Sequence, residues 1–129
     1  MITIHENIEY LHGACVEFAC ALHDQLGYTV EHVRRPDGTL THAYCITHKK
    51  HLRYFVDIRG VTSNWNEFVK PYYNELKESY AQLNIEPEDY VNLYKYDEDD
   101  PHAVFKNDEF LYRKAELIIC GNMDNYILK

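Results

Sequence analysis

One apolar helical segment, followed at once by three strand-like segments, most constrains the fold of this chain. Residues 15–26 (CVEFACALHDQL) contain no glycine or proline, and Gly27 follows them as a natural helix stop. The pattern then changes to strands at 28–35, 40–47 and 52–59, which are separated by the turns PDGT and HKKH. We therefore expect a helix packed on a three-stranded antiparallel meander.

Cys15 occupies the first turn of the predicted helix. Unpaired N–H groups and the positive end of the macrodipole at a helix N-terminus favour an anion, so we expect the thiol pKa to fall below the free value of about 8.5. A reactive cysteine requires such an environment. A single cysteine on an apolar helix is, however, more often a buried core residue.

His42 and Asp57 fall on the second and third predicted strands. If the second hairpin is symmetric about residues 48–51, Thr47 faces Leu52 and His42 lies directly opposite Asp57. Opposed Cβ atoms are roughly 4.5–5.5 Å apart, within reach of an imidazole–carboxylate hydrogen bond. A one-residue register slip would place the two side chains on opposite faces. A thiol, an imidazole and a carboxylate together are what a thiol nucleophile with an oriented base needs, whereas a lone His–Asp pair is a common structural contact.

The residues around these positions resemble a known superfamily. The segment GACVEFACAL, followed by HAY and then YFVDIRG, is similar to the papain-like superfamily, within it the compact transglutaminase-like and bacterial or phage cysteine-hydrolase cores. The resemblance covers residues 11–62. It implies an α+β papain-like core in which Cys15 is the nucleophile, His42 the general base and later acid, and Asp57 the group that orients the imidazole.

The resemblance also bears on the oxyanion hole. Gly13 matches the glycine two positions before the nucleophile, but no glutamine precedes Cys15 to supply the usual side-chain donor. His12 or Asn7 is then the candidate donor, together with the backbone N–H of Cys15. Arg59 ends the third strand beside the site, where it pairs with an acidic substrate group or with a surface carboxylate. The short connection from nucleophile to base leaves the substrate class open.

The second half of the chain predicts further helices. Ser63 or Asn64 is the N-cap of an amphipathic helix that is kinked or restarted at Pro71. Another short helix starts at Pro87, an acidic loop runs from Asp97 to Pro101, and a last helix extends through KNDEFLYRKAELIIC to Gly121.

Composition indicates one globular domain. The 129 residues are 46% hydrophobic, and neither a repeat nor a low-complexity linker divides them. We expect a single papain-like domain over 1–129, with its core at 11–62 and a helical covering region at 63–129. The chain has no apolar run of membrane-spanning length and no signal-like start, so we expect a cytoplasmic protein without a membrane partner.

Charge and aromatic content bear on partners. The net charge of −8 argues against nucleic acid, since phosphate binding draws on Lys and Arg. Tyr90, Tyr94 and Tyr96 stand beside the acidic run 97–100, and such a patch suits a basic protein partner, although a solvated loop next to core aromatics has the same pattern.

The four cysteines and eight histidines do not assemble a convincing metal site. The cysteines lack paired spacing such as CxxC, and in a reducing compartment they are most simply free thiols. His12 with Cys15, or His48 with His51, has short spacing, yet four convergent ligands cannot be assembled from these positions. We expect neither a metal nor a cofactor.

Two functions follow from these patterns. The first is a thiol-dependent hydrolase or acyltransferase (peptidase, amidase, deamidase or transglutaminase-like) that attacks a protein or a small amide or ester through Cys15 and a thioacyl intermediate. The second is a non-catalytic acidic, tyrosine-rich binding or inhibitor protein, of phage or mobile-element type, on the same scaffold.

Overall fold

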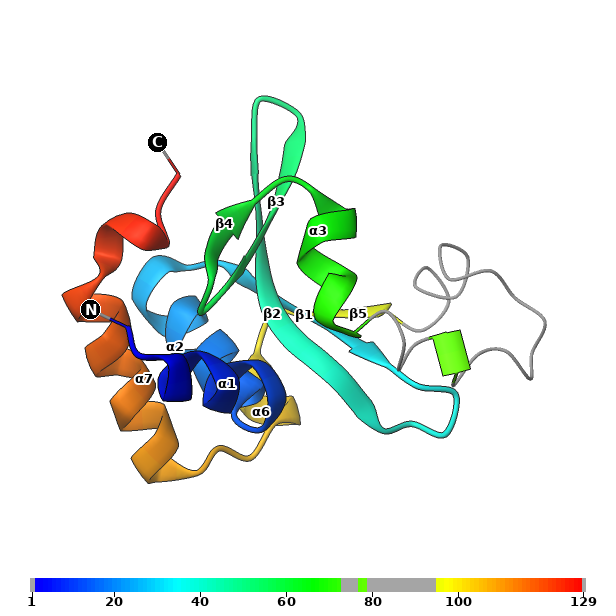
Figure 1. The fold of residues 1–129 in the computed structure, drawn as a ribbon, viewed down its shortest axis with the longest axis horizontal. Helices are drawn as coiled ribbons and strands as arrows, with labels where there is room; N and C mark the ends of the chain where they lie inside the picture. The colour runs from blue at the N-terminus through cyan, green and yellow to red at the C-terminus, as the bar shows by residue number, and fades with distance from the viewer. Residues whose placement is uncertain (1, 73–76, 79–94, 129) are drawn as a thin grey trace.

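A five-stranded antiparallel sheet forms the centre of the protein (Figure 1). The computed structural model describes residues 2–72, 77–78 and 95–128. The strand order is β4-β3-β2-β1-β5, and every neighbouring pair is antiparallel. The strands are β1 (Thr29–Arg34), β2 (Leu40–Lys49), β3 (Leu52–Asp57), β4 (Gly60–Thr62) and β5 (Lys95–Glu98). The predicted meander is therefore confirmed, with one strand added at each edge.

Helices precede and follow the meander, so the α+β class is also confirmed. The helix predicted at 15–26 has these bounds, and Gly27 ends it in the left-handed conformation at φ 74°. The helical elements with described bounds are α1 (Ile4–His12), α2 (Cys15–Leu26), α3 (Trp65–Val69), the 3₁₀ helix η1 (Lys70–Tyr72), α6 (Pro101–Val104), α7 (Glu109–Gly121) and the 3₁₀ helix η2 (Met123–Asn125).

Two apolar clusters lie on the two faces of the sheet. The larger one joins α2 to the sheet and to α7, and α2 contacts both (Figure 1). Within this cluster the Tyr126 hydroxyl donates to the carbonyl of Ile58 at 2.9 Å, while the Tyr28 hydroxyl donates to the carbonyl of Tyr126 at 2.8 Å. The smaller cluster joins β2 and β3 to α3 and η1 through Tyr44, Phe55, Phe68 and Tyr72.

The predicted helix ends are partly confirmed. Asn64 caps α3, where its side chain accepts from the N–H of Glu67. The helix changes to 3₁₀ geometry from Lys70, directly before Pro71, whose missing N–H cannot continue the α-helical ladder. The helix predicted at Pro87 lies outside the described residues, and the last helix begins later than expected because Asp108 caps it.

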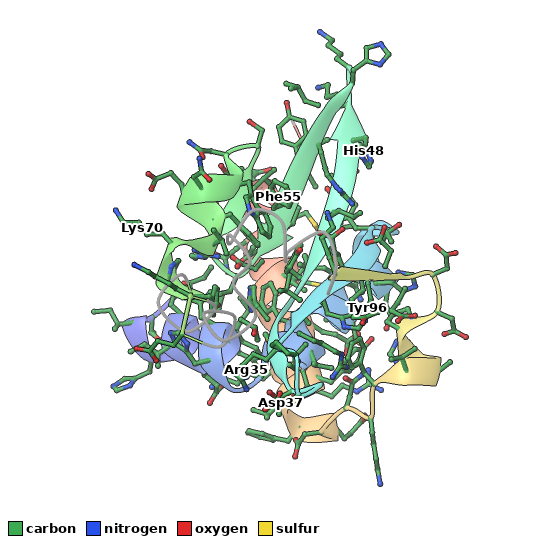
Figure 2. All side chains as sticks on the ribbon, turned by 90° about the vertical axis from the view of Figure 1, so that its right-hand side faces the viewer. Arg35, Asp37, His48, Phe55, Lys70 and Tyr96 are labelled. Carbon is green, nitrogen blue, oxygen red and sulfur yellow. The ribbon has the colours of Figure 1, made fainter. Side chains whose placement is uncertain are left out.

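The second hairpin differs from the prediction by two residues of register. Leu52 pairs with Lys49, not with Thr47. The turn consists of Lys50 and His51 alone, with φ of 52° and 69°, as in a type I′ turn. Our prediction assumed a longer symmetric loop and was wrong, because neither turn residue is the Gly or Asn that usually marks this turn. Figure 2 shows this hairpin, with His48 near its tip, extending beyond the rest of the fold.

The acidic segment is partly a strand. Residues Lys95–Glu98 pair with β1, with Glu31 opposite Asp97 and His32 opposite Tyr96, so the loop predicted from Asp97 begins only after this strand (Figure 2). Tyr90 and Tyr94 lie outside the described residues.

The state of the cysteines and the hydrophobicity of the helices complete the description of the fold. All four cysteines are free. Among the residues that the structure describes, none of the helices combines the length and the hydrophobicity that crossing a membrane would take.

Candidate active site

A buried hydrogen bond joins His42 on β2 to Asp57 at the end of β3. Nε2 of His42 lies 3.0 Å from Oδ2 of Asp57, and each side chain is only 3% exposed. An ionised carboxylate only accepts hydrogen bonds, so Nε2 carries the proton and donates. Nδ1 then holds the lone pair, and it has no hydrogen-bond partner among the described residues. The imidazole is thus oriented as a base with its free nitrogen inside the protein.

The predicted contact between these two side chains is confirmed, although the predicted register is not. In the observed ladder Cys45 pairs with Val56, which puts Asp57 at the level of Tyr44 and two residues away from His42. A shift of two residues keeps both side chains on the same face, where diagonal neighbours are within reach of long side chains.

Opposing effects set the protonation of the pair. Burial lowers the pKa of His42, while the hydrogen bond to Asp57 acts in the other direction. Burial acts to raise the pKa of Asp57, but hydrogen bonds from His42 and Arg59 outweigh it and hold that pKa below its ordinary value. The pair therefore rests as a neutral imidazole and an ionised carboxylate.

Cys15 begins α2 as predicted, but its thiol is buried, with the residue 8% exposed. Burial raises the pKa of the thiol, and the backbone N–H groups of Ala43, Val16 and Cys15 itself only oppose this effect. Our prediction of a lowered pKa was wrong, because the loss of hydration at this depth exceeds the effect of the helix terminus.

Cys15 and His42 are not hydrogen-bonded in the described structure. Cys15 belongs to the cluster under α2, which includes Ala43, whereas the His42 ring packs against Phe68 and Tyr72 of the other cluster. The N–H of Ala43, which faces the thiol, belongs to the residue after His42. The thiol therefore faces the backbone of β2 one residue after His42, while thiol and imidazole pack in different apolar clusters.

An aromatic cover from α3 and η1 closes over the imidazole. The Tyr72 ring stacks on His42 at 4.5 Å between centroids and 22° between planes, and Phe68 lies at 5.9 Å. The Tyr72 hydroxyl donates to the carbonyl of Leu11 at 2.7 Å, which fastens η1 to the end of α1. The helical spacing of Phe68 and Tyr72 indicated a buried face, but it gave no sign that His42 would be the residue it covers.

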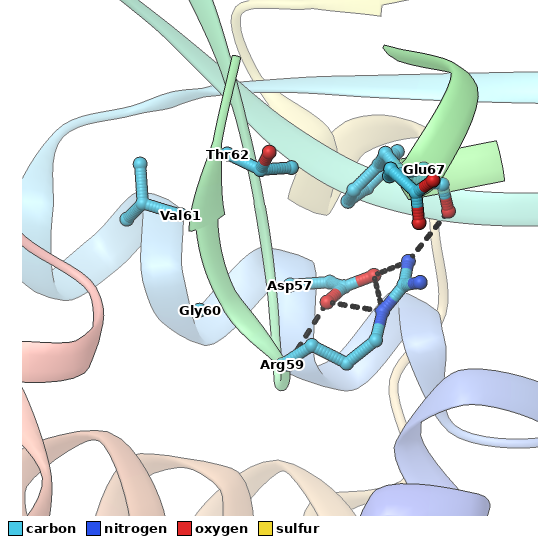
Figure 3. Close-up of a pocket in the computed structure, with 7 residues that line it drawn as sticks. Asp57, Arg59, Gly60, Val61, Thr62 and Glu67 are labelled. Carbon is cyan, nitrogen blue, oxygen red and sulfur yellow. Dashed lines mark hydrogen bonds and ion pairs between the residues drawn. The ribbon is translucent and has the colours of Figure 1, made fainter. Parts of the chain in front are cut away.

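Arg59 binds the carboxylate of the site. Its backbone N–H donates to Oδ1 of Asp57 at 2.9 Å and its Nη2 donates to Oδ2 at 2.6 Å, while Nε lies 3.1 Å and 3.2 Å from the two oxygens (Figure 3). Nη2 also donates to the carbonyl of Phe68 at 2.9 Å. The observed partner is thus the buried Asp57, and not the surface carboxylate that was one of the two predicted partners.

A small cavity adjoins this ion pair. Its volume is about 160 Å³, and Figure 3 shows the Arg59 side chain extending along it to Asp57. It is lined by Asp57, Arg59, Gly60, Val61, Thr62, Glu67 and Phe68.

The donor candidates Asn7 and His12 and the motif glycine Gly13 have different surroundings. Asn7 donates its side-chain N–H to the carbonyl of Thr3 within α1, and the N–H of Gly13 donates to the carbonyl of Glu9. The single N–H of Gly13 is therefore used in the helix cap, whereas the Asn7 amide group carries a second N–H. His12 is exposed at the end of α1, and its ring lies 5.7 Å from that of Tyr72.

Metal binding finds no support in the part of the chain that is described. Within residues 2–72, 77–78 and 95–128, no three His, Cys, Asp or Glu side chains converge as ligands of a metal ion would.

Comparison with known proteins adds no relative to this description. No protein-family model matches the chain, and neither a curated protein nor a solved structure matches it.

Proposed function

We propose that this protein is a cysteine-dependent hydrolase or acyltransferase with a papain-like core, in which Cys15, His42 and Asp57 act together. The observation that carries the proposal is the state of His42. Asp57 accepts its Nε2–H, and its Nδ1 has no hydrogen-bond partner among the described residues. A buried basic nitrogen without a partner is costly in a purely structural histidine.

The chemistry begins with transfer of the Cys15 proton to Nδ1 of His42, while the sulfur attacks the carbonyl carbon of an amide or ester. The imidazolium then gives its proton to the leaving group as the bond to that group breaks, which leaves a thioester on Cys15. Water or an amine attacks the thioester, His42 takes up the proton of that nucleophile, and the C–S bond breaks. The thiolate finally regains its proton from His42.

The surroundings of Cys15 support this sequence. The backbone N–H groups of Cys15, Val16 and Ala43 favour negative charge at the sulfur, and a tetrahedral oxyanion beside it needs donors of this kind. Hydrogen bonds between catalytic groups are often long in a free enzyme and shorten only when substrate binds. Access of a substrate to the imidazole requires displacement of the cover formed by Phe68 and Tyr72.

A test uses an activated ester, p-nitrophenyl acetate, with detection of the acetylated peptide by mass spectrometry. We expect a burst of nitrophenol and an acetyl group on Cys15, both lost in Cys15→Ser. In His42→Ala we expect the acylation rate to fall about 100-fold or more, since general base catalysis contributes that much.

The matched controls are Cys120→Ser and His48→Ala. Cys120 and His48 are exposed residues of the same types, away from Asp57, and both variants should keep the wild-type burst. Acetylation spread over all four cysteines, or a burst that persists in Cys15→Ser, would contradict the proposal.

A second candidate function is binding of a basic protein through the acidic strand β5. It is favoured by the exposure of Tyr96 and of the Asp97 side chain, which are 45% and 52% exposed, in contrast to the buried Cys15. Binding of an oligolysine peptide that weakens in Asp97→Asn, and not in Glu109→Gln on α7, would support this function. Equal affinity in the two variants would count against it.

A further inference from the structure

We propose that Arg59 is a positioning residue of the candidate active site, where it clamps the Asp57 carboxylate against His42 and anchors the aromatic cover through the Phe68 carbonyl. This inference rests on the proposed function, since it assigns a role within the same site. It implies that the site rests as an uncharged thiol and an uncharged imidazole, not as an ion pair of the two.

The clamp follows from the number of donors on one carboxylate. Oδ1 of Asp57 accepts from the backbone N–H and Nε of Arg59, and Oδ2 accepts from Nη2 of Arg59 and Nε2 of His42. A carboxylate offers about four lone-pair positions, so this set fills them. Rotation of the carboxylate away from His42 would break several charge-assisted hydrogen bonds at once.

The same guanidinium holds the cover. Nη2 donates to the Phe68 carbonyl at 2.9 Å, and the guanidinium carbon lies 4.7 Å above the Phe68 ring. Phe68 in turn packs against the imidazole of His42. A movement of α3 that uncovers the imidazole therefore disturbs the Arg59 contacts, and with them the orientation of Asp57.

Charge compensation determines the resting state. The buried Asp57 carboxylate alone would draw a proton onto His42, but the guanidinium, 2.6 Å from that carboxylate, offsets its charge. Burial then decides the balance and disfavours both the imidazolium and the thiolate. Among the described residues, the titratable or charged groups that face the His42 ring include Asp57, Arg59, His12, Tyr44 and Tyr72. Cys15 acts on Tyr72, which stacks on that ring.

The first experiment is an NMR titration of ¹⁵N-labelled wild-type protein. We expect His42 to be neutral at pH 7, with the proton on Nε2, and to titrate below the ordinary histidine value of 6.5. A His42 that is already imidazolium at pH 7 in the wild type would overturn the proposal.

The second experiment compares Arg59→Gln with Arg59→Lys. Loss of the cation should raise the pKa of His42 by about one unit or more, because the carboxylate is then uncompensated. The imidazolium so formed should stabilise the Cys15 thiolate and speed its alkylation by iodoacetamide severalfold near pH 7. Arg59→Lys keeps the cation and should retain the low pKa of the wild type.

Arg113→Gln is the matched control, since Arg113 binds Glu109 and Glu116 on the exposed face of α7. It should leave the His42 titration unchanged. Unfolding of Arg59→Gln would be recognised by alkylation of the buried Cys45. In that case the His42 titration of Arg59→Lys decides: a pKa as low as in the wild type supports the role of the cation, and a raised pKa contradicts it.

The two proposals fail in different ways. An unchanged His42 pKa in folded Arg59→Gln would overturn the role of Arg59, even if Cys15 forms an acyl intermediate. Conversely, acylation that persists in Cys15→Ser would overturn the proposed function. The His42 titration would still show whether Arg59 holds the Asp57 carboxylate.

Discussion

A fully buried carboxyl group stands on the other side of Tyr44 from the candidate site. Glu31 on β1 is 0% exposed, accepts from the Tyr44 hydroxyl, and accepts from Nη2 of Arg53 at 2.6 Å. Burial and the neighbouring Asp97 raise the pKa of Glu31 to about 7. At the scale of single residues, this carboxyl group, in contrast to the thiol of Cys15, has a pKa close to neutral pH.

The shift of Glu31 predicts a pH dependence of stability. The folded state binds the proton more tightly than the unfolded state, whose carboxyl has the ordinary pKa of 4.5, so this contribution is present at low pH and is lost as the pH rises through about 7. Glu31→Gln has no carboxyl group at this position, so its stability does not show this decrease with rising pH. Its free energy of unfolding relative to wild type should rise by about 2–3 kcal/mol between about pH 5 and pH 8 in urea titrations.

Glu109→Gln provides the control for this measurement, because Glu109 is exposed on α7. The difference in the free energy of unfolding between Glu109→Gln and wild type should vary little over the same pH range. A Glu31→Gln difference that is equally flat would show that Glu31 titrates at the ordinary carboxyl value when folded.

The candidate site shows which residue-level features a sequence reveals. The His42–Asp57 contact could be predicted, because alternation along two paired strands keeps their side chains on one face despite the two-residue error. Whether Cys15 is a reactive residue at a helix terminus or a buried core residue could not be decided, since this depends on the depth of the α2 terminus beneath other elements. Arg59 was assigned the wrong partner because a turn, not strand spacing, directs its side chain to Asp57.

At the scale of elements, the β2–β3 hairpin carries the main disagreement with the sequence. Helix α2 and three strands follow from apolar spacing and from Gly27, whereas the register depends on the turn at Lys50 and His51. Both residues adopt positive φ, which side chains other than Gly, Asn and Asp rarely favour. Strand β5 also escaped prediction, because the short charged segment KYDE becomes a strand only by pairing with β1.

The hairpin turn offers a stabilising substitution. Replacing Lys50 by Asn and His51 by Gly should raise the free energy of unfolding by about 1 kcal/mol, because a type I′ turn prefers this pair. Chemical denaturation of the double variant measures the gain. Glycine at His48, a strand position of the same hairpin, should instead lower stability, and a double variant no more stable than wild type would speak against the turn assignment.

At the scale of the whole molecule, the two apolar clusters share the sheet as a common wall. The α2 side includes Ala115, Ile118 and Ile119 of α7, and the other side includes Phe68 and Tyr72. Elements from the core region and from the covering region thus contribute to both clusters. We expect the two regions to unfold as one cooperative unit.

Trp65 makes this expectation measurable. It lies 5.0 Å from Phe55 and 6.0 Å from Phe68 between ring centroids, and it is the only tryptophan of the chain. Its fluorescence therefore reports on the α3 side of the sheet, whereas far-UV circular dichroism reports on all helices. The two urea transitions should coincide, and an earlier fluorescence transition would identify the cover as a separate unit.

Tyr126, near the end of the sequence, completes a cluster whose other parts are synthesised much earlier. Its hydroxyl binds the carbonyl of Ile58 across 68 residues of sequence, and its ring lies 5.5 Å from that of Phe18. On a translating ribosome, α2 and the meander emerge well before this partner exists. The centre of the α2 cluster is therefore completed only after Tyr126 has left the exit tunnel. Until then the packing between the nascent helix and the sheet lacks the Tyr126 ring.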